Sequence, residues 1–157
     1  MTLLRIIVVT LAVALAAPVV AQDKGTTNME ILREKIKADK KLVVAANMGL
    51  TEAEGTAFWP IYEAYQKDLQ QINQRLVKTI VAYAEAYNQG PVPNETAKKL
   101  LDEVLAIEGA EVTLKRSYVP KLEKVLPDAK VARYIQIENK IRALVRYELA
   151  DKIPLVK

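Results

Sequence analysis

Two glutamates spaced three residues apart, Glu108 and Glu111, are the best candidates for acid–base chemistry in this sequence. The chain has no histidine and no cysteine, and Ser117 is its one serine. These absences exclude Ser-His-Asp and Cys-His catalysis, and they exclude metal sites built from thiolates or imidazoles. A carboxylate-only enzyme would need this acid pair inside a shaped pocket. The spacing is more typical of a helix surface, because Glu111 and Lys115 are also four residues apart.

Glu111 also lies on the apolar stripe of its helix, where a polar side chain can fix the register of two packed helices. Two further spacings of four residues, Glu63 with Lys67 and Glu138 with Arg142, predict surface ion pairs within single helices. Structural roles therefore account for the acidic residues better than catalysis does. We expect a protein without enzymatic activity, cofactor or metal site.

Basic side chains form two groups that could bind acidic or unfolded partners, or a membrane face. The first group follows a helix near the N-terminus and consists of Arg33, Lys37, Lys40 and Lys41. The second group consists of Arg142 and Arg146, with Arg133 and Lys140 nearby. A solvated helix face is the alternative interpretation of both groups. We take the first group as the predicted binding site.

Tyrosines recur at helical spacing after a Phe-Trp pair, Phe58 and Trp59. They are Tyr62, Tyr65, Tyr83 and Tyr87. Tyrosine offers a large amphipathic contact area that suits an interface. Ordinary core packing between two helices is the stronger interpretation of this stripe.

Four segments show the three-to-four-residue period of amphipathic helices, and no alternation typical of strands is sustained. The expected helices span residues 28–48, 52–87, 94–125 and 128–153. A capping box at Thr51, a left-handed stop at Gly49 and an N-cap at Asn94 mark their boundaries. Pro60 should bend the second helix without breaking it. We predict an all-α fold of four helices, in which the short loop at 88–93 makes the second and third a long antiparallel hairpin.

The first 21 residues have the pattern of a cleaved secretion signal. A short charged start, Met1–Arg5, precedes an apolar run, and Val19–Ala21 suits a cleavage site after Ala21. The alternative, a stable membrane anchor, is disfavoured because Pro18 interrupts an uncharged run shorter than the roughly 20 apolar residues of a spanning helix. We therefore expect export to the periplasm.

The expected mature chain has a disordered tail at residues 22–27 and one helical domain at 28–153. Without cysteine it must be stable by packing alone. The formal net charge of +4 falls to +3 when Arg5 is removed with the signal. This mildly basic balance lacks the clustered charge of a nucleic-acid footprint. We expect no nucleic-acid partner.

Two helix starts echo each other along the chain. The first is Leu50-Thr51-Glu52-Ala53-Glu54, and the second is Leu126-Pro127-Asp128-Ala129-Lys130. Aligned on their leucines, they place Phe58 opposite Tyr134 and Ile61 opposite Ile137. Leu126-Pro127 should end the third helix, and Pro127 suits the first turn of the fourth.

These features resemble the Spy/CpxP family of periplasmic proteins, which carry an LTXXQ motif. The two motif copies would be Leu50-Thr51 with Glu54, and Leu126-Pro127 with Lys130, so that Glu54 and Lys130 each replace the motif's glutamine. The resemblance covers residues 29–152. The Phe58-Trp59-Pro60 segment is not typical of the family's best-known members and favours a separate branch.

The resemblance implies a hairpin-like subunit that forms a homodimer shaped as a cradle. It implies an ATP-independent, stress-response chaperone whose clients are unfolded or envelope proteins, with apolar contacts supported by the basic positions. The alternative within the same family is a regulatory partner of the periplasmic domain of an envelope-stress sensor kinase. Neither role is enzymatic.

Overall fold

The computed structural model describes residues 40–157. The chain divides into two units between Val43 and Val44. In the first unit the described residues, 40–43, are helical, and the helical stretch continues to residue 48 in the second unit. The predicted signal, the tail at 22–27 and most of the first expected helix lie outside the described residues. The rest of this section concerns the unit Val44–Lys157.

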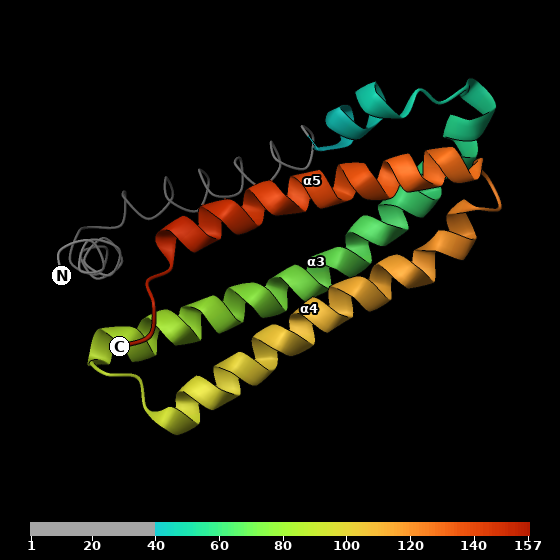
Figure 1. The fold of residues 1–157 in the computed structure, drawn as a ribbon. Helices are drawn as coiled ribbons and strands as arrows, with labels where there is room; N and C mark the ends of the chain where they lie inside the picture. The colour runs from blue at the N-terminus through green and yellow to red at the C-terminus, as the bar shows by residue number, and fades with distance from the viewer. Residues whose placement is uncertain (1–39) are drawn as a thin grey trace, which may run out of the picture. The chain divides into compact units, whose positions relative to one another are not determined.

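Three long helices follow the short helical stretch, and residues 40–157 contain no strand. They are α3 (Glu52–Gln89), α4 (Asn94–Leu122) and α5 (Asp128–Lys152). Figure 1 shows α3 and α4 side by side as an antiparallel hairpin, with α5 running in the same direction as α3. The predicted all-α fold with its long hairpin is confirmed.

The start of α3 follows the predicted capping chemistry. Glu54 N–H donates to Thr51 Oγ1 at 3.3 Å, and Thr51 N–H donates to Glu54 Oε2 at 2.7 Å. Gly49, just before this cap, has the left-handed φ of 57° expected of a helix stop. Pro60 lies inside α3 without ending it, although an interior proline costs about 3 kcal/mol if its missing hydrogen bond is not compensated.

The starts of α4 and α5 differ from the expectation. Pro93 is the N-cap of α4, and its carbonyl accepts from Ala97 N–H at 2.9 Å, so Asn94 is the first helical residue and not the cap. Pro127 likewise caps α5 and does not enter its first turn. Proline suits both positions because its fixed φ costs nothing there and its missing N–H has no helical partner to lose. The third helix also ends earlier than predicted, at Leu122.

Aromatic rings fill the core where α3 and α5 begin and α4 ends. Phe58 and Tyr134 meet edge to face with centroids 5.2 Å apart, and Tyr65 meets Tyr118 at 5.3 Å. Tyr62 completes this group, which we call the aromatic core. All five side chains are at most 4% exposed. The core role predicted for the tyrosine stripe is thus confirmed for Tyr62 and Tyr65, with α5 as an additional partner.

Candidate functional site

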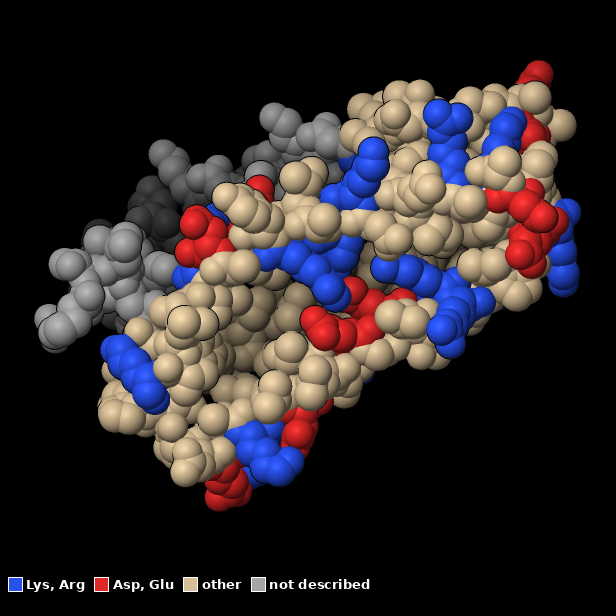
Figure 2. Space-filling view, viewed as in Figure 1, with Lys and Arg blue, Asp and Glu red and all other residues tan. Residues whose placement is uncertain are grey.

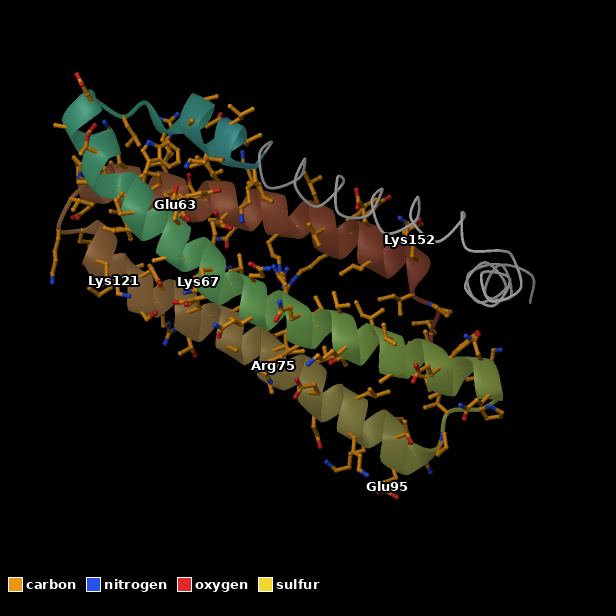
Figure 3. The ribbon with its side chains drawn as sticks, turned by 180° about the vertical axis from the view of Figure 1, so that it is seen from behind. Glu63, Lys67, Arg75, Glu95, Lys121 and Lys152 are labelled. Carbon is orange, nitrogen blue, oxygen red and sulfur yellow. The ribbon has the colours of Figure 1, made fainter. Side chains whose placement is uncertain are left out.

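A cavity of about 610 Å³ lies at the opposite end of the three helices. Its walls come from the second half of α3, the first half of α4, and the end of α5 with the C-terminal tail. Figure 2 shows it as a hollow with mostly uncharged walls and with charged side chains at its edge. Its aliphatic lining includes Leu76, Ile80, Leu100, Val104, Leu149 and Ile153. We call this cavity the groove.

The groove exists because α5 does not pack closely on the hairpin at this end. The hairpin helices are held together here: viewed from behind, Arg75 lies between α3 and α4, where its Nε donates to Glu103 Oε1 at 3.0 Å. On α5, the positions turned toward the hairpin carry Arg142 and Arg146. Long side chains that reach across the gap leave space between the backbones.

A buried ion cluster closes the inner end of the groove and joins all three helices. Arg142 Nε donates to Glu111 Oε2 at 3.1 Å, and Arg142 Nη1 donates to Asn73 Oδ1 at 2.9 Å. A second ion pair joins Arg142 Nη2 to Glu111 Oε1. Arg146 Nη2 also donates to Glu111 Oε2 at 3.1 Å. The Glu111 side chain is only 4% exposed, so these two arginines compensate a buried carboxylate.

Burial sets the protonation behaviour around this cluster. It lowers the pKa of Arg142, and the positive charge of Arg146 lowers it further. The pKa of Lys115 is also lowered, first by burial and then by Arg146. An arginine remains charged despite such a shift, because its ordinary pKa is above 12. Arg142 therefore keeps its positive charge and connects α5 to α4 through Glu111.

The predicted Glu111–Lys115 pair is wrong. Lys115 Nζ donates to Asn139 Oδ1 at 2.8 Å, while Glu111 turns to the arginines of α5. The reason is burial: Glu111 faces the interior, and a neighbouring helix supplies closer partners than its own helix does. The structure places Glu108 at the groove too, 3.7 Å from Arg146 Nη2.

The C-terminal tail crosses from the end of α5 to the end of α3 (Figure 1). Tyr83 Oη donates to the carbonyl oxygen of Pro154 at 2.8 Å, and Lys157 Nζ lies 4.2 Å from the ring centre of Tyr87. Between these two contacts, Leu155 and Val156 line the groove while remaining largely exposed. The tail thus borders the outer end of the groove and contacts Tyr83 and Tyr87, the two tyrosines of the α3 stripe that lie outside the aromatic core.

Large aliphatic side chains are also exposed along α4. Leu101, Leu105 and Val112 are 56%, 55% and 50% exposed. Separations of four and seven residues place them on one face of the helix. Leu101 also lines the groove, so this face, which we call the α4 row, continues the apolar surface outward.

The two echoing helix starts lie together in the structure. Lys130 Nζ donates to Glu54 Oε2 at 2.6 Å and to the Gly49 carbonyl oxygen at 2.9 Å. Leu126 is buried in the core, and Leu50 packs against it. The hydrogen bond from Lys130 lowers the pKa of Glu54, as does the bond from Thr51 N–H. Glu54 and Lys130, the last residues of the two echoing helix starts, are thus ion-pair partners.

The predicted basic binding site is not brought to the groove by any described contact. Arg33 and Lys37 lie outside the described residues. Lys40 and Lys41 are helical and belong to the first unit, so their role stays a prediction. The second basic group divides, because Arg142 and Arg146 join the ion cluster. Sequence could have signalled this cluster, since a glutamate on one apolar stripe and two arginines four residues apart on another helix suit each other.

Residues 40–157 meet the requirements of neither a metal site nor a membrane-spanning helix. No group of acidic side chains in this range is arranged to hold a metal ion. Within the same range, no helix has the length and apolar character needed to cross a bilayer. Comparisons with protein-family models, curated proteins and solved structures found no match to the chain.

Proposed function

We propose that this protein is a periplasmic, ATP-independent chaperone that holds apolar segments of unfolded proteins on the α4 row. The half-exposure of Leu101, Leu105 and Val112 is the observation that carries the proposal. Single exposed leucines are common on protein surfaces. Several large apolar side chains exposed on one helix face are more typical of a surface that binds another protein.

The geometry of the α4 row suits an extended client. Its members follow one face along the axis of α4, so a client segment could contact them in succession. Glu108, which lies between Leu105 and Val112 in sequence, is half exposed and can form part of a polar rim. Because the row is exposed in the folded protein, binding would need no opening of the aromatic core.

Aggregation of a chemically denatured client, followed by light scattering without ATP, tests this proposal. The variant combines Leu105→Gln with Val112→Gln, and the control is Leu144→Gln on α5, which removes a leucine that is even more exposed, at 68% against 55% for Leu105. We expect the full chain and the control to suppress aggregation near equimolar amounts and the double variant to lose most of this effect. Equal suppression by the double variant, with unchanged circular dichroism, would overturn the proposal.

Two rival roles of the α4 row would give different results. If the protein were a regulator with one specific partner, even the wild-type chain would not suppress the aggregation of a generic client. A second copy of this chain on the row would give a dimer in sedimentation experiments, and the double variant would then be monomeric.

A further inference from the structure

We propose that the groove binds one long-chain fatty acid, with its carboxylate at Arg146 and its hydrocarbon chain along the aliphatic walls. This site goes beyond the proposed chaperone function and depends on different residues from those of the α4 row, apart from Leu101 at the shared border. Three features of the groove support the proposal: its size, the chemistry of its walls and the charge at its inner end.

The dimensions of the groove suit a single narrow ligand. Its volume of about 610 Å³ lies within the range of about 300–1,000 Å³ typical of small-molecule sites. Along α4 its lining extends from Ala97 to Glu111, which corresponds to about 20 Å at the helical rise. One acyl chain spans about half of the roughly 30 Å hydrocarbon core of a bilayer. A groove of this length therefore accommodates one chain and its headgroup.

The walls select for a hydrocarbon and not for a polar ligand. All three helices contribute aliphatic side chains, for example Leu76, Val104 and Leu149. Thr79, the polar residue on the α3 wall, already donates its hydroxyl to the Arg75 carbonyl oxygen at 2.9 Å. Along the middle of the groove a ligand thus meets mainly apolar surface, as in sites that take aliphatic chains.

The inner end supplies a cation for the carboxylate. Arg142 is committed to Glu111 and Asn73. Arg146 donates from Nη2 to Glu111 Oε2 at 3.1 Å, but its side chain is half exposed and lines the groove. Its approach to Glu108 is 3.7 Å, too long for a hydrogen bond, and Glu108 is itself half exposed. A ligand carboxylate can replace Glu108 at Arg146 while the bond to Glu111 is kept, because a guanidinium has five N–H donors and can pair with a carboxylate through two of them. Arg142 would continue to compensate Glu111.

The C-terminal tail would cover the far end of the hydrocarbon chain. Leu155 and Val156 line the groove but are 90% and 58% exposed, so a ligand would bury apolar surface that now faces water. The bond from Tyr83 to Pro154 fixes the tail beside the groove before any ligand binds.

Calorimetric titration of the full, delipidated chain with palmitate tests the site. Hexadecanol, with the same chain length and no charge, and lysophosphatidylcholine, with a bulky zwitterionic headgroup, are the comparison ligands. We expect one palmitate per chain, and binding of both comparison ligands at least tenfold weaker. Equal affinity for hexadecanol and palmitate would show that Arg146 does not recognise the carboxylate, and it would overturn the proposal. The absence of palmitate binding to the folded chain would also overturn it. Tighter binding of lysophosphatidylcholine would overturn the choice of ligand.

Two variants locate the ligand. Arg146→Gln should weaken palmitate at least tenfold while leaving hexadecanol unchanged. Ala150→Trp, which adds bulk at the groove from an exposed position on α5, should abolish binding of both. Retention of palmitate affinity in both variants would overturn the proposed site. The Leu105→Gln/Val112→Gln variant should bind palmitate normally even if it no longer protects clients, so failure of either proposal is recognised independently of the other.

Discussion

The same three helices pack tightly around aromatic rings at one end and leave a cavity at the other. At one end, Phe58, Tyr65 and Tyr134 lie in edge-to-face contact, and almost none of their surface is exposed. At the other end, the inward residues are aliphatic on the hairpin and include Arg142 and Arg146 on α5, and a cavity of about 610 Å³ remains. Aromatic rings are large enough to fill the space between helices, whereas bridging arginines reach across it. The chain therefore combines a closed core at one end with an open groove at the other.

The first way to test this contrast is to remove volume at each end. Phe58→Ala should lower the free energy of unfolding by about 3–5 kcal/mol, because it leaves a cavity in a fully buried site. Leu76→Ala, at the groove wall, should cost much less, because the removed atoms already border open space. Urea unfolding followed by circular dichroism measures both. Equal losses would mean that the groove is as tightly packed as the aromatic core.

The ion cluster should be sensitive to single substitutions but tolerate joint replacement of both partners. Glu111→Leu leaves Arg142 buried without its carboxylate and should cost about 3 kcal/mol or more. The combined change of Glu111→Leu and Arg142→Met should recover most of that loss, since apolar residues can replace a buried pair. Lys115→Gln is the control and should have little effect. If the double variant is no more stable than Glu111→Leu alone, the two side chains are not energetically coupled.

Alkaline pH should weaken the aromatic end first. Burial raises the pKa of Tyr62 to about 12, and burial with the bond to Asp68 raises that of Tyr118 to about 12. Unfolded tyrosine releases its proton near pH 10, so the folded form holds more protons between pH 10 and 12 and its stability falls across that window. Tyr62 alone should contribute about 2–3 kcal/mol to this loss. Tyr62→Phe should flatten the pH profile, and an unchanged profile would contradict the assignment.

The smallest expected effect concerns the two motif copies. The pKa of Glu54 is lowered, so its contribution to stability is present above the ordinary value of 4.5 and is lost as pH falls through the folded pKa. Glu54→Gln should therefore shift the acid-unfolding midpoint slightly upward. Adding Lys130→Gln, which places glutamine at both motif positions, should partly reverse the change. If the effects of the two substitutions on stability simply add, the result would argue against the ion pair.

Sequence periodicity sufficed to predict the helices because each apolar stripe is local and continuous. The same periodicity predicted the core role of Tyr62 and Tyr65, and the residue types Thr51 and Glu54 predicted the capping box. It could not predict the groove, because the stripe of α3 continues from Tyr65 through Leu76 without any change of period. What changes is the partner on α5, from Tyr134 to Arg142, and this depends on which faces the folded helices present.

The same limit explains the partners of Glu111. Its position on an apolar stripe was visible in the sequence, but the spacing to Lys115 favoured a partner on its own helix. The arginines of α5 pair with Glu111 because they reach the buried side of α4. In the sequence they are instead close to Arg133 and Lys140, and that proximity suggests a basic face. The side chain of Asn94 suits an N-cap, but Pro93 occupies that position because proline cannot supply the N–H of a helix interior.

A nuclear magnetic resonance titration of the full chain with a soluble, permanently unfolded client would test most directly whether the two ends differ in function. We expect backbone chemical shifts to change along residues 97–112 of α4, and residues around Phe58 and Tyr134 to remain unchanged. Changes confined to the aromatic end, or no changes at saturating client, would contradict the assignment of α4 as the binding surface.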